Sequence, residues 1–270
     1  MRPAAEPPCL VERSVGGVDV LLPAHMLSAG FAGGFAGRFG GVSAGPYASL
    51  NVSPAVGDDE AAVAENRARA ARALGLAPGS LVTRTQVHGA RVGVFGGFGE
   101  ERPECDALIS TRPGLGVGVV VADCVPLLLA DPESGLCAAV HVGWRGLVAG
   151  VIEAAVGRLA ALGAESVGLL AAVGPAIGPC CCEVGPEVAG ALGRAYPGEC
   201  GAWLSGGGPR PRLNLPRASE VILVRLGVDP ANIVSAGLCT RCHTDRFFSY
   251  RAAGGVTGRM LAAIAREGTA

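Results

Sequence analysis

The chain has 270 residues, of which 50% are apolar and 17% are charged, and its formal net charge is -1. This composition excludes an intrinsically disordered chain, which needs low hydrophobicity and high charge. It also lacks the basic excess of a charge-driven nucleic-acid binder. All 22 basic residues are arginines, so mechanisms that need a Schiff-base lysine or a P-loop lysine are excluded.

No stretch of the sequence predicts a membrane span or an export signal. The most apolar stretch, residues 115–130, contains Asp123 and Pro126 and is shorter than the ~20 residues of a spanning helix. The N-terminal residues lack the apolar core of a signal peptide. Without export, the 10 cysteines indicate reduced thiols, metal ligands or catalysis rather than disulfides. We therefore expect a cytoplasmic protein that binds neither membranes nor nucleic acid. We expect it to be a monomer, with an oligomer as the alternative.

The predicted elements begin with a helix over residues 58–75, which opens on acidic capping residues and ends at Gly75. Short apolar runs bounded by Gly, Pro or Asp then predict strands over 81–87, 90–95, 106–110, 117–122, 126–131 and 136–142. Ala-rich amphipathic segments predict helices over 146–163, 186–195, 216–227 and 256–267. Residues 205–212 predict a flexible loop inside the domain. This alternation by itself favours an α/β fold.

Three residues of ligand type stand at the ends of predicted strands. His88 and His141 each lie beside a turn signal, and Cys124 follows Asp123 at the end of a third strand. If these ends meet at one rim of a sheet, two His and one Cys form a known catalytic zinc set with the fourth position open. The intervals of 36 and 17 residues match no compact zinc finger. Two turn histidines and a buried thiol are the alternative interpretation.

Further candidates surround these three residues. Asp123 is a candidate for taking a proton or for orienting a ligand histidine, with a turn-forming Asp as the alternative. An arginine beside His141 and a strand-like FFSYR offer groups for phosphate or for stacking on a base. A Gly-rich segment, residues 40–52, allows the backbone to approach an anion closely. The candidates for binding substrate or phosphate are therefore Arg38, Ser43, Asn51, Arg145, Tyr250 and Arg251.

Eight motifs occur in one order between Phe31 and Met260. They are GGVSAGPYASLNV (40–52), TQVHG (85–89), CDALIS (105–110), ADCVPLLLAD (122–131), HVGWRG (141–146), IGPCCCEVG (177–185), FFSYR (247–251) and TGR (257–259). In these motifs the chain closely resembles the YfiH family, once labelled multicopper polyphenol oxidases or laccases. That family has been redescribed as purine nucleoside phosphorylases with adenosine deaminase and methylthioadenosine phosphorylase activity.

The resemblance implies a fold and a ligand set. It implies an α+β fold in four layers, α/β/β/α, with mixed sheets, as in YfiH proteins and the cytotoxic necrotizing factor. Residues 1–30 would be an N-terminal segment with a first strand, and residues 31–270 a single catalytic domain. One zinc would bind His88, Cys124 and His141. The chain departs from the family pattern at Val142, at Cys182 and between Arg251 and Thr257, which affects substrate contacts more than metal binding.

The function implied by the resemblance is zinc-dependent phosphorolysis of purine nucleosides. Adenosine, inosine, guanosine or methylthioadenosine would react with inorganic phosphate to give the base and ribose 1-phosphate, with adenosine deaminase activity besides. The catalytic residues would be His88, Cys124, His141 and Asp123. The alternative is a cysteine hydrolase or peptidoglycan-editing factor with Cys124 as nucleophile.

Two further interpretations, one with copper and one with haem, have less support in the sequence than the zinc interpretation. Four histidines without an HxH pair exclude the full copper assembly of a laccase, so weak polyphenol oxidation would need adventitious copper. The residues from Cys239 to His243 spell CxxCH, the c-type haem attachment pattern, but such attachment follows export, and we interpret the match as chance. The run of cysteines at 180–182 is expected to hold structural thiols, because adjacent side chains point apart.

Overall fold

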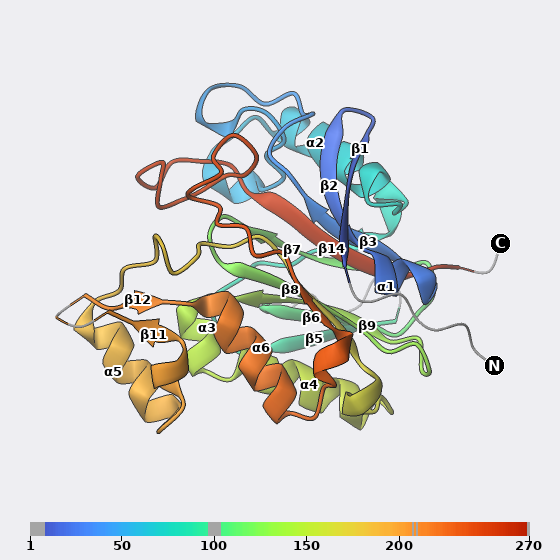
Figure 1. Cartoon of the computed structure of the whole chain (residues 1–270). Helices are drawn as coiled ribbons and strands as arrows, with labels where there is room; N and C mark the ends of the chain where they lie inside the picture. Colours follow the sequence, from blue (N-terminus) through green and yellow to red (C-terminus); the bar gives the residue numbers. More distant parts are fainter. Residues whose placement is uncertain (1–8, 97–103, 207, 209, 269–270) are drawn as a thin grey trace.

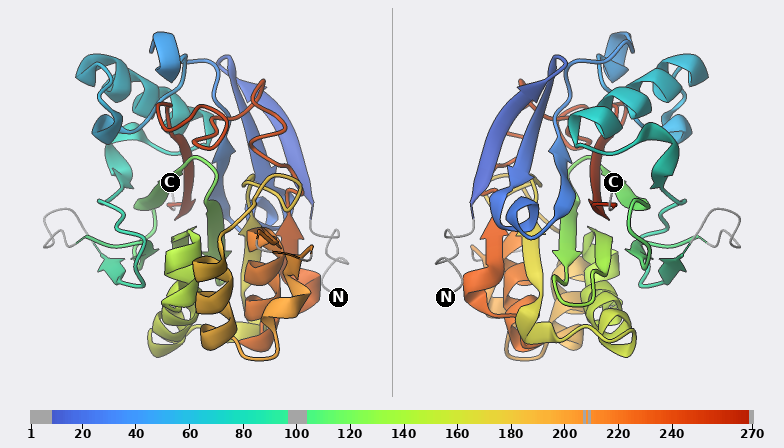
Figure 2. Two further views of the ribbon diagram at one scale, coloured as in Figure 1. Left: turned by 90° about the vertical axis from the view of Figure 1, so that its left-hand side faces the viewer. Right: turned by 90° about the vertical axis from the view of Figure 1, so that its right-hand side faces the viewer.

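The computed structural model describes residues 9–96, 104–206, 208 and 210–268. Two large mixed sheets lie face to face, and helices cover their outer faces, so that the layers run α/β/β/α from top to bottom in Figure 1. The two side views in Figure 2 show the same stacking. The four-layer α+β fold implied by the family resemblance is therefore confirmed, and the plain α/β fold favoured by the alternation of elements is wrong.

The first sheet has the strand order β1-β2-β3-β14-β7-β4. All its neighbours are antiparallel except β7 and β4, which are parallel. Its strands are β1 (Leu10–Val15), β2 (Val18–Pro23), β3 (Phe31–Ala36), β4 (Leu81–Val82), β7 (Gly116–Val121) and β14 (Met260–Arg266). β1 and β2 lie within the predicted N-terminal segment, residues 1–30, and extend the same sheet as β3. The division into this segment and a domain over residues 31–270 stays a prediction.

The second sheet has the order β13-β10-β8-β9-β6-β5. Its outermost pairs, β13 with β10 and β6 with β5, are parallel, and the inner pairs are antiparallel. Its strands are β5 (Val92–Phe95), β6 (Ala107–Ser110), β8 (Val125–Ala130), β9 (Cys137–Val142), β10 (Leu170–Val173) and β13 (Ile233–Ser235). Every residue of β8 and β9 is buried, which explains why their sequences are apolar throughout.

Helices complete the outer layers. A short helix, α1 (Ala24–Ser28), connects β2 to β3, and α2 (Glu60–Ala73) covers the first sheet. The second sheet is covered by α3 (Trp144–Val148), α4 (Val151–Ala161), α5 (Pro186–Ala195) and α6 (Leu215–Arg225). A small hairpin joins β11 (Leu204–Ser205) and β12 (Arg212–Leu213). The described 3-10 turns are Gly45–Tyr47, Pro54–Val56, Pro78–Ser80, Ser166–Gly168, Cys200–Ala202 and Pro230–Asn232.

The apolar core forms three layers that follow this architecture. One lies between α2 and the first sheet, one between the two sheets, and one between the second sheet and its helices. No helix in the described part of the chain is long and apolar enough to cross a membrane.

Several predicted elements are confirmed. The helix predicted over 58–75 is α2, whose first turn is capped by the Asp59 side chain at the N–H of Ala62. The helices predicted over 186–195 and 216–227 are α5 and α6. The single helix predicted over 146–163 is instead α3 followed by α4. The helix is interrupted at Gly150, whose φ of +81° lies outside the helical region.

The helix predicted over 256–267 is wrong. Residues 260–266 form β14, which pairs with β3 on one side and β7 on the other and is buried along almost its whole length. The helix propensity of its alanines is weaker than the gain from filling the centre of a sheet. Small residues also suit this place, because the backbone of Gly33 approaches so closely that a Cβ there would collide with the Ala263 carbonyl.

The strand predicted over 81–87 is mostly wrong, since only Leu81 and Val82 pair as β4. Further along, the side-chain amide of Gln86 takes the place of a strand. It accepts a hydrogen bond from the Val120 N–H at 2.8 Å and donates one to the Val120 carbonyl at 2.8 Å. The loop predicted over 205–212 holds the ends of β11 and β12, while residues 207 and 209 lie outside the described residues.

Candidate metal centre

Three side chains from separate parts of the chain form a cluster of ligand type. His88 lies in the loop after β4, Cys124 directly precedes β8, and His141 lies in β9. Their ligand atoms all lie within 4.8 Å of one another. The Cys124 Sγ is 4.0 Å from His88 Nε2, and the two imidazole centroids are 4.7 Å apart. The fold thus brings together the three residues that the sequence singles out.

A buried carboxylate, Asp106, fixes the orientation of His141. The Asp106 side chain is fully buried, and its Oδ1 lies 2.8 Å from His141 Nδ1. Because an ionised carboxylate only accepts hydrogen bonds, the imidazole proton lies on Nδ1 and leaves Nε2 free to act as a ligand. A carboxylate behind a histidine in this way is the usual support of a metal-ligating imidazole.

The same carboxylate holds the loop that carries His88. Its oxygens accept hydrogen bonds from the backbone N–H groups of Val87, His88 and Gly89, at 3.2, 2.9 and 2.8 Å. These bonds stabilise a strained turn, since His88 has a φ of +59°, a conformation that few non-glycine residues adopt. Asp106 therefore positions both histidines. The sequence predicts it only as the first residue of a strand, although its charge inside the apolar CDALIS motif is a signal.

The charges of the cluster favour a thiolate. Burial by itself raises the pKa of the Cys124 thiol, but the charge of His141 and hydrogen bonds from both histidines lower it well below its usual value. Burial likewise lowers the pKa of His141, but the Cys124 thiolate and Asp106 raise it overall. Without a bound ion the two shifts describe one thiolate–imidazolium pair, and an ion bound at His141 Nε2 would displace the proton from that nitrogen. A thiolate is the form of cysteine that binds metals and acts as a nucleophile.

One face of the cluster is lined by glycine. A Cβ placed on Gly143 would lie 2.9 Å from His88 Cδ2 and 3.2 Å from Cys124 Sγ. Glycine in HVGWRG is therefore required by the close approach of the ligand side chains. His141 is buried, whereas His88 is exposed, so the cluster opens to solvent on the His88 side.

Asp123 lies next to the cluster but bonds away from the histidines. Its Oδ1 accepts a hydrogen bond from Thr240 Oγ1 at 2.6 Å, and its Oδ2 accepts one from the Arg251 N–H at 2.7 Å. Its φ of +82° turns the chain immediately before Cys124. Asp123 therefore joins the 240–251 loop to the cluster, and the support of a ligand histidine falls to Asp106. A role of Asp123 in proton transfer stays a prediction.

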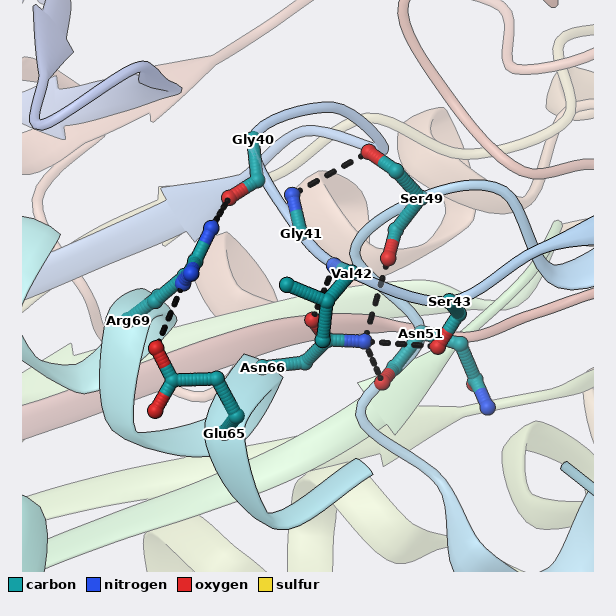
Figure 3. Close-up of polar contacts among 9 residues, drawn as sticks. All are labelled: Gly40, Gly41, Val42, Ser43, Ser49, Asn51, Glu65, Asn66 and Arg69. Carbon is teal, nitrogen blue, oxygen red and sulfur yellow. Dashed lines mark hydrogen bonds and ion pairs between the residues drawn. The ribbon is translucent and has the colours of Figure 1, made fainter. Parts of the chain in front are cut away.

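The Gly-rich segment is held by α2. Asn66, fully buried on that helix, accepts a hydrogen bond from the Val42 N–H and donates to Ser43 Oγ and to two backbone carbonyls of the loop (Figure 3). Ser43 Oγ and Asn51 Nδ2 both donate to a carboxylate oxygen of Asp58. These contacts give Ser43 and Asn51 a scaffolding role, and their predicted binding of phosphate stays a prediction.

The remaining predicted substrate contacts lie in different surroundings. Arg38 donates to the carbonyls of Thr244 and Ala48 and lies over the Phe248 ring. Arg145 is exposed at the start of α3, with its guanidinium 4.4 Å from the Trp144 ring centroid.

Arg259, the arginine of the TGR motif, is a further cation that the sequence does not single out as a candidate. Tyr250 is exposed, and the Arg259 guanidinium lies 5.4 Å from its ring centroid. Burial lowers the pKa of Arg259, while the nearby Tyr250, Cys124 and Asp123 oppose that shift. Arg259 is therefore a cation beside an exposed aromatic ring, and its charge interacts with those of Cys124 and Asp123.

The residues of the cluster fit a zinc-class ion. Two imidazoles and a thiolate are a known zinc ligand set, a carboxylate supports His141 from behind, and the open side leaves room for a further ligand. The fold and this site together define a protein with a candidate His2Cys metal site at the rim of one of two stacked mixed sheets.

Comparison with known proteins identifies the family. Residues 32–267 match the family model described as multi-copper polyphenol oxidoreductase laccase, and the chain belongs to this family. It is 43% identical over 213 residues to purine nucleoside phosphorylase ORF3 of Streptomyces griseus, covering 78% of this chain and 84% of that one.

Two further matches agree with this assignment. The chain is 35% identical over 231 residues to adenosine deaminase RL5 of an unknown prokaryotic organism, covering 82% of this chain and 88% of that one. The crystal structure of the hypothetical protein YfiH from Bacillus licheniformis matches with a TM-score of 0.87 and 30% identity, covering 95% of this chain and 99% of that one. The resemblance to the YfiH family is thereby confirmed.

Proposed function

We propose that the protein is a zinc-dependent purine nucleoside phosphorylase that also deaminates adenosine. The observation that carries the proposal is the convergence of His88, Cys124 and His141 around a buried Asp106. The names of the relatives, a purine nucleoside phosphorylase and an adenosine deaminase, supply the substrate class.

In this proposal His88 Nε2, Cys124 Sγ and His141 Nε2 hold the ion. A zinc ion bound by three protein ligands polarises an oxygen ligand at its open position. Asp106 keeps the Nδ1 proton of His141 in place, so that Nε2 stays directed at the ion. Its bonds to the 87–89 backbone hold His88 in its left-handed conformation, so the ligand geometry is present before substrate arrives.

Phosphorolysis breaks the bond between C1′ of the sugar and the purine nitrogen and forms a bond from C1′ to a phosphate oxygen. The purine leaves with the electron pair of the broken bond and takes up a proton. The protein must therefore bind an anion and a base side by side. We assign the anion to Arg259, with Arg145 and Arg251 as further candidates, and the base to the exposed ring of Tyr250.

Deamination replaces the C6 amino group of adenosine by a water oxygen and releases ammonia. This reaction needs a group that takes a proton from water and returns one to the leaving nitrogen. Asp123 is our candidate, because it directly precedes Cys124. Its hydrogen bonds from Thr240 and Arg251 fix the position of its carboxylate.

Product analysis tests the proposed reactions. Purified protein is incubated with adenosine or inosine, with and without phosphate, and the products are resolved by liquid chromatography and mass spectrometry. We expect free base and ribose 1-phosphate only when phosphate is present, and inosine from adenosine. Turnover of neither nucleoside would contradict the proposal.

Removal of the ligands tests the role of the metal. We expect His88→Ala, Cys124→Ala and His141→Ala each to lower zinc content and to abolish both activities, since three ligands leave no redundancy. Circular dichroism serves as the check that the fold persists. Full activity in any of these variants after its zinc is removed would show that the metal mechanism is wrong.

A second candidate function follows from the same geometry. A Cys124 thiolate beside two imidazoles is also the arrangement of a cysteine hydrolase, with a histidine as general base. The two functions differ in their response to chelation. A hydrolase would keep its activity in chelator and lose it on alkylation of Cys124, whereas we expect chelator alone to abolish nucleoside turnover.

A further inference from the structure

A second cluster of ligand-type side chains lies outside the site described above. Cys180 and Cys181 stand in the loop after β10, and Cys239 and Cys242 stand in the loop after β13. The four Sγ atoms all lie within 4.8 Å of one another. Adjacent cysteine side chains are expected to point apart, but the tight turn at Gly178, whose carbonyl accepts the Cys181 N–H at 3.0 Å, makes that expectation wrong for Cys180 and Cys181.

The distances between the sulfurs match a tetrahedral metal site. Cys242 Sγ lies 3.6 Å from Cys180 Sγ and 3.5 Å from Cys181 Sγ. With a zinc–sulfur bond of about 2.3 Å, the edges of a regular tetrahedron of sulfurs are about 3.8 Å long. A disulfide bond of about 2.05 Å is far shorter, and all ten cysteines are free thiols in this structure. Cys239-x-x-Cys242 also has the ligand spacing of structural zinc sites.

The surroundings of the sulfurs suit a bound metal thiolate. The Gly178 N–H donates a hydrogen bond to Cys239 Sγ at 3.2 Å, and backbone donors to sulfur are a usual support of metal-bound thiolates. A Cβ on Gly178 would lie 3.2 Å from Cys239 Cβ, so the missing side chain permits this approach. An adjoining cavity of about 250 Å³ is lined by Cys180, Cys181, Glu183, Arg212, Arg241 and Arg251.

The arginines of this cavity would balance the negative charge of such a site. One zinc ion and four thiolates have a net charge of about -2, which needs neighbouring cations or donors where it is partly buried. Arg241 lines the same cavity as Cys180 and Cys181. Arg241 lies between Cys239 and Cys242 in the chain, so the ligand loop itself carries part of the compensating charge.

We propose that Cys180, Cys181, Cys239 and Cys242 bind a single zinc-class ion as a structural tetrathiolate site, separate from the His88–Cys124–His141 cluster. The ion would tie the loop after β10 to the loop after β13. This assigns the CxxC of the CxxCH pattern to a metal site rather than to haem attachment. His243 is not among its ligands, and its backbone N–H donates a hydrogen bond to the Cys239 carbonyl.

The proposed site would also brace the first cluster. Thr240, next to Cys239, donates to Asp123 Oδ1, and the Ile177 N–H, at the start of the other loop, donates to the Asp123 carbonyl at 2.9 Å. Both tied loops therefore hold the residue that precedes Cys124. This connection gives the second metal a positioning role for the first cluster.

Zinc stoichiometry tests the proposal on the full chain. Protein made with added zinc and purified under reducing conditions is analysed by mass spectrometry of the metal. We expect two zinc ions per wild-type chain, one in Cys180→Ser/Cys242→Ser, one in His88→Ala/His141→Ala, and none when the four changes are combined. Cys180 and Cys242 are both exposed, so the serine variant is expected to fold. Cys200→Ser, a half-buried cysteine outside both clusters, is the control and should keep two ions.

Thiol protection tests it without any substitution. Cys9 and Cys242 are both exposed, so in metal-free protein iodoacetamide should modify both. With zinc we expect Cys242 and Cys180 to be protected and Cys9 to react as before, and chelator should reverse this protection. After cobalt exchange, the serine variant should lose the sulfur-to-cobalt charge-transfer absorption of a tetrathiolate.

Each of the contrary results would overturn the proposal. These are an unchanged zinc content in Cys180→Ser/Cys242→Ser, alkylation of Cys242 as fast in zinc-loaded as in metal-free protein, and a Cys180–Cys242 or Cys181–Cys242 disulfide in protein that holds one zinc ion. None of these readouts depends on nucleoside turnover, so a failure of the proposed function leaves the second site standing.

Discussion

The two ligand clusters of this molecule are built from different parts of the fold. His141 lies inside the buried strand β9, Cys124 adjoins the buried strand β8, and the buried Asp106 holds both histidines by hydrogen bonds. The four cysteines instead lie on two loops, and two of their side chains are exposed. The geometry of the His88–Cys124–His141 cluster is therefore imposed by the sheet, whereas the geometry of the four cysteines depends on the ion that we propose to join the loops.

The largest effect is expected from removing the support of the first cluster. Asp106→Asn keeps the shape of the side chain but turns one acceptor into a donor, which then faces N–H donors. We expect the free energy of unfolding to fall by about 3 kcal/mol and zinc affinity at this cluster to fall roughly 10- to 100-fold. Chemical denaturation and competition with a chelator measure the two quantities.

Asp131→Asn is the matched control for this change. Asp131 is also a buried carboxylate that holds a turn, through hydrogen bonds from the N–H groups of Glu133 and Ser134. We expect a loss of stability without a loss of zinc. Equal zinc affinity in Asp106→Asn and wild type would show that the sheet holds the histidines without this carboxylate.

A smaller effect on stability but a clear effect on metal is expected at Gly143. Gly143→Ala places a methyl group against His88 and Cys124, and the exposed His88 ring is the group free to shift. We expect zinc affinity to fall roughly tenfold, with a change in unfolding free energy below about 1 kcal/mol. Isothermal titration with zinc measures the affinity.

Gly157→Ala provides the contrast to Gly143→Ala. Gly157 lies in α4, where an added methyl group would meet no atom of another element within 4 Å. Alanine should therefore raise stability by about 0.5–1 kcal/mol and leave zinc binding unchanged. An undiminished zinc affinity in Gly143→Ala would contradict the close packing of the ligands.

The smallest effect on zinc binding is expected where the two clusters are connected. Thr240→Val removes the hydroxyl that bonds Asp123 and keeps the volume of the side chain. We expect the free energy of unfolding to fall by about 1–2 kcal/mol, with zinc still bound at both clusters. Thr240→Ser, which keeps the hydroxyl, should restore most of the loss. If valine and serine have the same stability, the bond to Asp123 does not join the two regions.

Sequence patterns predicted the parts of this fold that depend on local order. The capped, amphipathic α2 and the short α5 were predicted closely, because their periodicity and end signals lie within the helix itself. The proximity of His88, Cys124 and His141 was also predicted, because residues of ligand type stand beside turn signals.

What the sequence did not show depends on distant contacts. The Ala-rich residues of β14 have the local character of a helix, and only their place between β3 and β7 makes them a strand. The role of Asp106 requires a strand pairing with β9 that brings it to His141. The Gly-rich segment with Ser43 and Asn51 predicts an anion-binding loop, which stays a prediction, whereas the hydrogen bonds by which Asn66 of α2 holds this loop are seen only in the structure.

The central position of β14 also bears on how the chain is made. Its neighbours β3 and β7 are synthesised long before residue 260 leaves the ribosome, and no direct pairing joins them. Until then the first sheet consists of two separate pieces with open edges, which are prone to pair with other chains. We expect that these edges are exposed during synthesis for the time needed to make about 140 further residues after β7, so that chaperone contact would fall mainly in this interval.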